Sequence, residues 1–239
     1  MPGVLRLLAL LALVMSAFTA CDTAAPRAAE RTATSVEAAS PPTSPAPEPQ
    51  PLESVPSPLG PVDPQPSDGR PRQAQLTIAK LGIDQLTVVP YRGFTDDASG
   101  TGIQNGGLAA SPHGPRGGVG AGGIGNYQVT AHRTSSTRAF EFLPALRIGD
   151  RVSVVAGGRR YLYRITATRS TSFRSARSLA QQRAPVPGHP GRPATRAMIT
   201  LSTCATQEDH AVGNYWSDEF DNPEHRIDKI GVLIRSTRL

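Results

Sequence analysis

The chain has 239 residues, of which 38% are hydrophobic, and a formal net charge of +6 that comes almost entirely from arginine. This length and composition predict one folded domain with tails. No aromatic-basic motif of a nucleic-acid binder accompanies the arginines, so we expect no nucleic-acid partner. We interpret the arginines as solvated surface, and the alternative is a basic face toward anionic envelope polymers or lipid headgroups.

Residues 1–21 have the pattern of a secretory signal peptide. Arg6 supplies the positive end, and the apolar stretch from Leu7 to Phe18 is shorter than the ~20 residues that span a bilayer. The stretch runs into Thr19-Ala20-Cys21, which resembles the lipobox of bacterial lipoproteins. We therefore predict lipid attachment at Cys21, and the alternative is ordinary secretion with a fortuitous cysteine.

Residues 22–72 are rich in alanine, proline, serine and glutamate and show no apolar periodicity. Such a segment cannot bury a core, so we predict a disordered linker. In polyproline geometry, at ~3.1 Å per residue, it would reach up to ~150 Å. The folded domain is expected to occupy residues 73–239.

Short apolar runs with period-two character, separated by Gly, Pro and Asp, predict an antiparallel all-β sandwich or barrel from residue 73 onward. The runs are Gln75–Ile78, Leu86–Val89, Gly125–Ala131, Arg151–Ala156, Arg160–Ala167, Met198–Thr203 and Lys229–Arg235. A hairpin turn is predicted at Gly157-Gly158.

Two short helices are predicted, at Arg138–Leu146, which Pro144 limits in length, and at Ala176–Arg183. The glycine-dense segment from Gly100 to Gly125 contains no phosphate-binding loop and is expected to be an irregular excursion between strands.

Cys204 ends a β-branched, apolar run and is the only cysteine besides Cys21. Lipidation of Cys21 would forbid a disulfide between them, so Cys204 is expected to be a free thiol. A free thiol in an exported protein favours a functional role over a purely structural one.

Four segments in order resemble the sortase family of cysteine transpeptidases. They are Leu76–Asp84, Gly125–Arg133 with His132, the Leu-x-x-Gly-Asp turn at Leu146–Val152, and Thr203-Cys204 followed by Arg226. The resemblance covers about residues 75–236 and is closest to the actinobacterial class E sortases. It implies a closed eight-stranded β-barrel with one or two short helices and a substrate groove at one end.

The resemblance assigns Cys204 as nucleophile and His132 as general acid/base. An imidazole can accept the thiol proton and later protonate the leaving amine. His132 follows a strand-like run, which would fix its direction. The other histidines lie in loops or beside charged residues: His113, His189, His210 and His225.

Arg226 is predicted to stabilise the oxyanion and to position the substrate, because a guanidinium offers a fork of donors. Arg226 precedes the last predicted strand, and Arg235 inside that strand is the alternative. Thr203 would support the oxyanion through its backbone or hydroxyl, and its alternative is simple strand propensity.

The segment between Cys204 and Arg226 is acidic, with Glu208, Asp209, Asp218, Glu219, Asp221 and Glu224. It lacks the spacing of an EF-hand loop, so we expect a solvated acidic loop, no metal and no cofactor, and the alternative is a calcium site.

The resemblance implies a sortase that cleaves a Leu-x-x-Thr-Gly-like sorting signal, with alanine after leucine as in class E. Its partners would be surface proteins carrying C-terminal sorting signals and an amine of a peptidoglycan precursor or pilin. The location would be outside the cytoplasm, on the outer face of a Gram-positive-type cell, held at the membrane by a lipid or a signal anchor. The alternatives are a hydrolytic thiol peptidase and a non-catalytic lipoprotein binding module on the same barrel.

Overall fold

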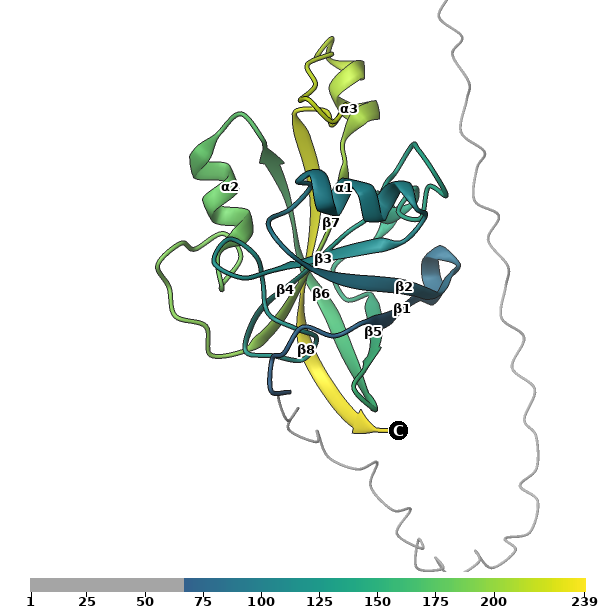
Figure 1. Cartoon of the computed structure of the whole chain (residues 1–239), viewed down its shortest axis with the longest axis vertical. Helices are drawn as coiled ribbons and strands as arrows, with labels where there is room; N and C mark the ends of the chain where they lie inside the picture. Colours follow the sequence, from purple (N-terminus) through teal and green to yellow (C-terminus); the bar gives the residue numbers. More distant parts are fainter. Residues whose placement is uncertain (1–66) are drawn as a thin grey trace, which may run out of the picture. The chain divides into compact units, whose positions relative to one another are not determined.

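The computed structural model describes residues 67–239, so the predicted leader, Cys21 and the linker up to residue 66 lie outside the described residues. Eight strands close into a barrel in the order β1-β2-β3-β4-β7-β8-β6-β5 (Figure 1). The predicted closed eight-stranded barrel is therefore confirmed. Within residues 67–239, no helix has the length and apolar character needed to cross a membrane.

The elements follow one another with short connections, except for the longer segments before β4, β5, β7 and β8. They are β1 (Ala74–Ile78), the 3-10 turn η1 (Ala79–Leu81), β2 (Ile83–Arg92), α1 (Ala98–Asn105), β3 (Ala109–His113), β4 (Gly125–Thr130), the 3-10 turn η2 (Leu143–Ala145), β5 (Arg151–Ala156), β6 (Arg159–Ser172), α2 (Ala176–Arg183), β7 (Ala197–Cys204), α3 (Thr206–Ala211) and β8 (His225–Arg238).

The barrel mixes parallel and antiparallel pairs. β2 pairs with β3 and β4 pairs with β7 in parallel, and the remaining neighbours are antiparallel. A parallel pair needs a crossover connection, and the long segment between β4 and β7 supplies one. The predicted hairpin joins β5 to β6 at Gly157 and Gly158, whose φ angles of 56° and 71° suit a tight left-handed turn.

The core fills the barrel interior with alternate residues of each strand. Strand side chains alternate between the two faces, so β5 buries Val152 and Val154 while Arg151 points outward. The segment before β5 closes one side with Phe140, Leu143 and Leu146, all nearly inaccessible to solvent. This packing holds the strand ends in a fixed register.

Two sequence predictions were wrong in detail. The segment from Gly100 to Gly125 is not wholly irregular, because α1 extends into it and β3 lies within it. The helix predicted at Arg138–Leu146 is reduced to the 3-10 turn η2. Pro144 and the left-handed φ of 55° at Arg138 are incompatible with a continuous α-helix there.

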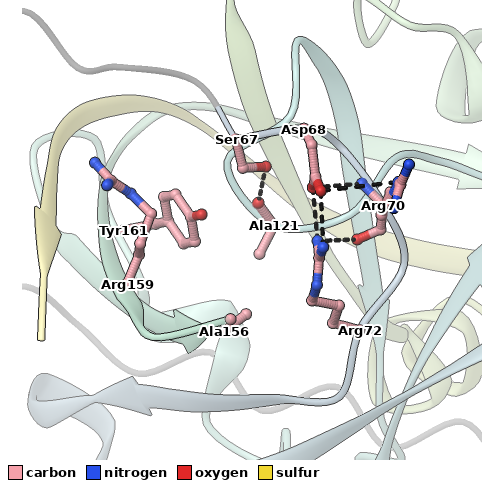
Figure 2. Close-up of a pocket in the computed structure, with 9 residues that line it drawn as sticks. Ser67, Asp68, Arg70, Arg72, Ala121, Ala156, Arg159 and Tyr161 are labelled. Carbon is pink, nitrogen blue, oxygen red and sulfur yellow. Dashed lines mark hydrogen bonds and ion pairs between the residues drawn. The ribbon is translucent and has the colours of Figure 1, made fainter.

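Residues 67–72, which the sequence assigned to the end of the linker, contact the domain. The Ser67 hydroxyl donates to the carbonyl of Ala121 at 2.6 Å, and the carboxylate of Asp68 accepts from Arg72 at 2.6 and 2.7 Å (Figure 2). The Gly120 amide donates to the carbonyl of Gly69 at 2.8 Å. These contacts fasten the start of the described chain to the loop before β4.

Candidate active site

Three of the predicted site residues lie on neighbouring segments at one end of the barrel. Cys204, the last residue of β7, is the Cα partner of Arg226 on β8. On its other side, β4 runs parallel to β7 and its last pair joins Thr130 to Ser202. His132 lies two residues after Thr130, and Cys204 lies two residues after Ser202. If the β4–β7 register is continued past the last pair, His132 falls opposite Cys204.

Thr203 links the segment of the histidine to the strand of the cysteine. Its buried hydroxyl donates to the carbonyl of Ala131 at 2.8 Å, and the Ala131 amide donates to the carbonyl of Ser202 at 3.4 Å. The Thr203 hydroxyl is therefore engaged with the backbone next to His132. This contact continues the pairing of the two strands past the end of β4.

Arg133 strengthens the same link. One guanidinium nitrogen donates to the carbonyl of Cys204 at 3.2 Å and to the carboxylate of Glu208, and the other donates to Gln207 at 2.8 Å. Arg133 is buried, so these donors replace water. The carbonyl of Cys204 is thus held by the residue that follows His132, and α3 holds the guanidinium of that residue in place.

Burial controls the ionisation of the thiol and the imidazole. Desolvation raises the pKa of Cys204, although the positive charge of Arg226 opposes the rise. Desolvation also lowers the pKa of His132, although the negative charge of Asp96 opposes the fall. Both shifts favour the uncharged forms, so the pair rests as a neutral thiol and a neutral imidazole at neutral pH.

The imidazole of His132 is oriented by α1. Its Nε2 lies 2.8 Å from Oδ1 of Asn105, the last residue of that helix. When Nε2 donates its proton to this oxygen, Nδ1 is left as the basic nitrogen. Asn105 was not predicted from the sequence, because the helix that positions it was not predicted.

The guanidinium of Arg226 is buried and held on two of its three nitrogens. Nε donates to Oδ2 of Asp96 at 2.8 Å, and Nη1 donates to the carbonyl of Pro223 at 2.7 Å. The ring of Phe173 lies 4.0 Å from Cζ, a cation–π contact. Among the described residues, Nη2 has no hydrogen-bond partner. One donor is therefore left for a ligand.

Asp96 is a second site residue that the sequence reasoning missed. Its side chain is 5% exposed and that of Arg226 is 0% exposed. The second carboxylate oxygen accepts from Nε2 of Gln104 at 2.8 Å, and the backbone at Asp96 has a left-handed φ of 57°. A buried carboxylate needs such partners, and a sequence separation of 130 residues from Arg226 hid the pair.

The structure distinguishes Arg226 from Arg235, the alternative arginine for the site. Arg226 was expected just before the last strand, but it lies inside β8, because that strand begins at His225. Arg235 lies near the far end of β8, is exposed, and pairs with Leu162 of β6. Only Arg226 of the two faces Cys204.

The other histidines have different surroundings. His225 places Nδ1 2.7 Å from Oδ1 of Asp209, and His210 stacks on Tyr215 with ring centroids 4.7 Å apart. His113 and His189 lie at the end of β3 and in the loop after α2. Register brings the backbone of His225 opposite Ala205, whose amide donates to the His225 carbonyl at 2.9 Å, but alternation along β8 places its side chain on the face opposite that of Arg226. The other three are not brought beside Cys204 by strand register.

The acidic loop is largely folded on itself. Asp209 accepts from the His225 amide at 3.0 Å, Asp218 accepts from the Phe220 amide at 2.9 Å, and Glu224 accepts from the Ser172 hydroxyl at 2.9 Å. Glu219 and Asp221 are exposed. In residues 67–239, no group of three or more His, Cys, Asp or Glu side chains is arranged to hold a metal ion.

A cavity of about 310 Å³ lies at the other end of the barrel, between the first described residues and the β5–β6 hairpin (Figure 2). Its lining includes Asp68, Arg72, Ala121 and Tyr161, and none of the candidate catalytic residues. β8 shows the separation of the two ends, because Arg226 pairs with Cys204 near its start and Arg238 pairs with Arg159 at its end.

Solved structures with a similar fold are sortases. The sortase SrtA from Actinomyces oris has a TM-score of 0.52 and 16% identity over 72% of this chain and 90% of its own. Sortase E1 from Streptomyces coelicolor, solved with a tripeptide in the active site, has a TM-score of 0.51 and 18% identity over 73% and 94%. A mutant of sortase E from Streptomyces avermitilis has a TM-score of 0.50 and 21% identity over 72% and 93%.

No curated protein matches the chain by sequence. The family model of the sortase domain, in contrast, matches residues 76–216. This segment includes His132 and Cys204 and ends before Arg226, and it makes up more than half of the chain. The chain therefore belongs to the sortase family, whose members are cysteine transpeptidases.

Proposed function

We propose that this chain cleaves a Leu-x-x-Thr-Gly-like sorting signal, with alanine in the second position, and transfers the acyl group to an amine of a peptidoglycan precursor or pilin. The observation that carries the proposal is the strand register that sets Cys204 between Arg226 and the segment of His132. A nucleophile at the end of β7, an oxyanion donor on β8 and a base just beyond the end of β4 are the parts that acyl transfer needs.

Attack begins from the neutral pair. The thiol proton of Cys204 passes to the basic nitrogen of His132 as the sulfur bonds to the carbonyl carbon of the threonine. The carbonyl oxygen becomes negatively charged in this step. The neutral resting forms are supported by the raised pKa of Cys204 and the lowered pKa of His132.

Arg226 donates from Nη2 to the oxyanion. A donor held in place on its other two nitrogens by Asp96 and Pro223 needs little reorganisation when the charge develops. The intermediate collapses as the carbon–nitrogen bond breaks, and His132 returns its proton to the glycine amine. An incoming neutral amine then attacks the thioester and His132 accepts its proton. The carbon–sulfur bond breaks, and the thiolate takes this proton from His132, which restores the neutral pair.

Asp96 is assigned to positioning in this scheme. Its carboxylate occupies Nε of Arg226, so the guanidinium plane is set with Nη2 free. Removing this partner would leave a buried cation uncompensated, which is costly.

We place the domain outside the cytoplasm, tethered through a lipid on Cys21 or through an uncleaved signal anchor. The sequence before residue 22 supports this placement by its short apolar stretch and its lipobox-like end. Mass spectrometry of the native N-terminus and detergent partitioning of a Cys21→Ser variant distinguish the two anchors. A mature chain that begins at Cys21 and carries lipid is the expected result, and retention of Leu7–Phe18 contradicts lipidation.

The test of the reaction uses the full chain, a set of Leu-Ala-x-Thr-Gly and Leu-Pro-x-Thr-Gly peptides, and several amines, with products read by mass spectrometry. Amide products with loss of the glycine fragment are expected. Free acid as the only product would replace the proposal with the hydrolytic peptidase. No cleavage, together with no trapping of Cys204 by a peptidyl electrophile, would favour the binding module.

A further inference from the structure

The outer face of β5, β6 and β8 carries a group of arginines that the proposed reaction does not use. We define the arginine face by Arg151, Arg160, Arg164 and Arg235, which are all exposed. Their neighbours along the same strands, such as Val152, Tyr161 and Tyr163, are buried in the barrel. Because side chains alternate along a strand, the four arginines lie on one outward face.

Register places these arginines close to one another. Arg151 of β5 is the Cα partner of Arg164 of β6, and Arg235 of β8 is the partner of Leu162. Arg160 lies two residues before Leu162 on the same side of β6. Leu162 therefore lies between Arg160 and Arg164 along β6 and opposite Arg235, while Arg151 is diagonal to it across β5.

The charges of the arginine face are not compensated within the described residues. None of the four arginines takes part in an ion pair there, whereas Arg72 and Arg133 do. The chain has ten arginines and no acidic residue between positions 151 and 207. Asp84 lines a cavity with Arg160 but lies beyond ion-pair distance from it.

This arrangement costs stability in the isolated domain. Like charges directly opposite each other on neighbouring strands, as in Arg151 and Arg164, destabilise a sheet. An anionic surface that binds the face would relieve the repulsion. Arginine forks suit phosphate groups, because they donate two parallel hydrogen bonds.

We infer that the arginine face binds the headgroups of an anionic phospholipid bilayer. The charges are spread over three adjacent strands around a partly exposed leucine, which suits an extended anionic surface with an apolar interior. The face lies along the strands and not at the Cys204 end of the barrel. Docking through it leaves that end open to an approaching peptide.

The test measures partition of the full chain onto phosphatidylcholine vesicles with and without phosphatidylglycerol. We compare the wild type with a variant in which Arg151, Arg160, Arg164 and Arg235 are changed to Gln. The matched control changes Arg92, Arg177, Arg192 and Arg196 to Gln, which are exposed residues off the arginine face. Both variants lose the same net charge, so long-range attraction falls equally.

At about fivefold per arginine near an anionic surface, the face variant should lose on the order of 10²–10³-fold in partition onto anionic vesicles. The control should lose much less, and partition onto neutral vesicles should not change in either variant. The wild-type preference for anionic vesicles should weaken as salt is added. Equal losses in the two variants, or no preference of the wild type for anionic vesicles, would overturn the inference.

Two further measurements keep the test decisive. A double variant, Arg160→Gln with Arg164→Gln, carries half of the changes and replaces the fourfold variant if that one does not fold. Its loss of partition onto anionic vesicles should be intermediate. A soluble poly(glycerol phosphate) is offered in place of vesicles. If it binds through the same four arginines while anionic vesicles do not, the bilayer assignment is wrong. Neither measurement depends on catalysis, so failure here leaves the proposed reaction untouched.

Discussion

The carboxylate of Asp96 holds the guanidinium of Arg226 through a 2.8 Å contact between Oδ2 and Nε, in a pair that is almost wholly removed from solvent. Burial lowers the pKa of His132 and raises that of Cys204, and the negative charge of Asp96 opposes the first shift and adds to the second. Asp96 thus affects the orientation of Arg226 and the ionisation of His132 and Cys204.

The first prediction concerns the pH dependence of kcat/KM. The rate should require His132 without its added proton and Cys204 with its proton. The acidic limb should lie below the ordinary pKa of 6.5 because the pKa of His132 is lowered, and the basic limb above 9.0 because that of Cys204 is raised. In Asp96→Asn both limbs should move to lower pH, since a charge that raises both pKa values is lost.

An unchanged profile in Asp96→Asn would mean that Asp96 is only structural. Asp96→Ala serves as the comparison, because it removes the charge and also the hydrogen-bond acceptor of the buried Arg226. That variant should lose about 3–5 kcal/mol in the free energy of unfolding, measured by denaturant titration, whereas Asp96→Asn keeps a hydrogen-bond acceptor and should lose less.

The second prediction is that Cys204→Ala abolishes peptide cleavage and amine transfer while the melting temperature stays close to that of the wild type. Cys204 is the only free cysteine of the described domain, and a methyl group in its place removes little buried volume. Turnover by a folded Cys204→Ala protein would refute the thioacyl mechanism.

The third prediction is that His132→Ala lowers kcat by about 10²–10⁴-fold, the usual contribution of a positioned acid–base group. His210→Ala is the matched control, since its ring stacks on Tyr215 and is not aligned with Cys204. Single-turnover kinetics should show the loss in thioester formation. If the control lost activity and His132→Ala did not, the assignment of the base would be wrong.

The fourth prediction is that Arg226→Lys lowers kcat by about 10²–10³-fold although the positive charge is kept. An ammonium group cannot contact Asp96 and Pro223 and also present a third donor in the same plane. Arg235→Lys should leave turnover of soluble peptides unchanged. The reverse result would assign the oxyanion donor to Arg235.

The fifth prediction concerns the exposed carboxylates of the loop between α3 and β8. Negative potential near the thioester should attract a cationic amine, so Glu219→Gln with Asp221→Asn should lower the ratio of transpeptidation to hydrolysis at low salt. Asp218 is left unchanged because it accepts from two backbone amides of the turn. The same ratio in the variant and the wild type at low salt would reduce the loop to a solvated surface.

Local pattern was sufficient to predict most elements of the barrel. The strand Arg151–Ala156 and the helix Ala176–Arg183 have the predicted bounds, because alternation and a Ser175 cap are visible in the chain itself. β3, α1 and α3 were missed, and α3 lies in the segment that was expected to be a solvated acidic loop. α1 contains two glycines and no apolar stripe, and it is held by the Asp97 cap and by tertiary packing.

The candidate site could be predicted only where family motifs lie next to the reacting residues. Cys204 and His132 end recognisable runs, whereas Asp96 and Asn105 carry no local signal. Their roles depend on contacts with Arg226 and His132 that the barrel brings together across long sequence separations. The extension of β8 back to Arg226 likewise depends on pairing with β6 and β7.

The end of α1 has a consequence for control of the enzyme. Gln104 and Asn105 are consecutive, and they reach the carboxylate that holds Arg226 and the imidazole of His132 respectively. The helix sits against Tyr91 at Gly100, where a Cβ atom would come within 2.4 Å of the phenolic oxygen. One small helix therefore positions His132 directly and Arg226 through Asp96, so a displacement of α1 would disturb both side chains in a single movement.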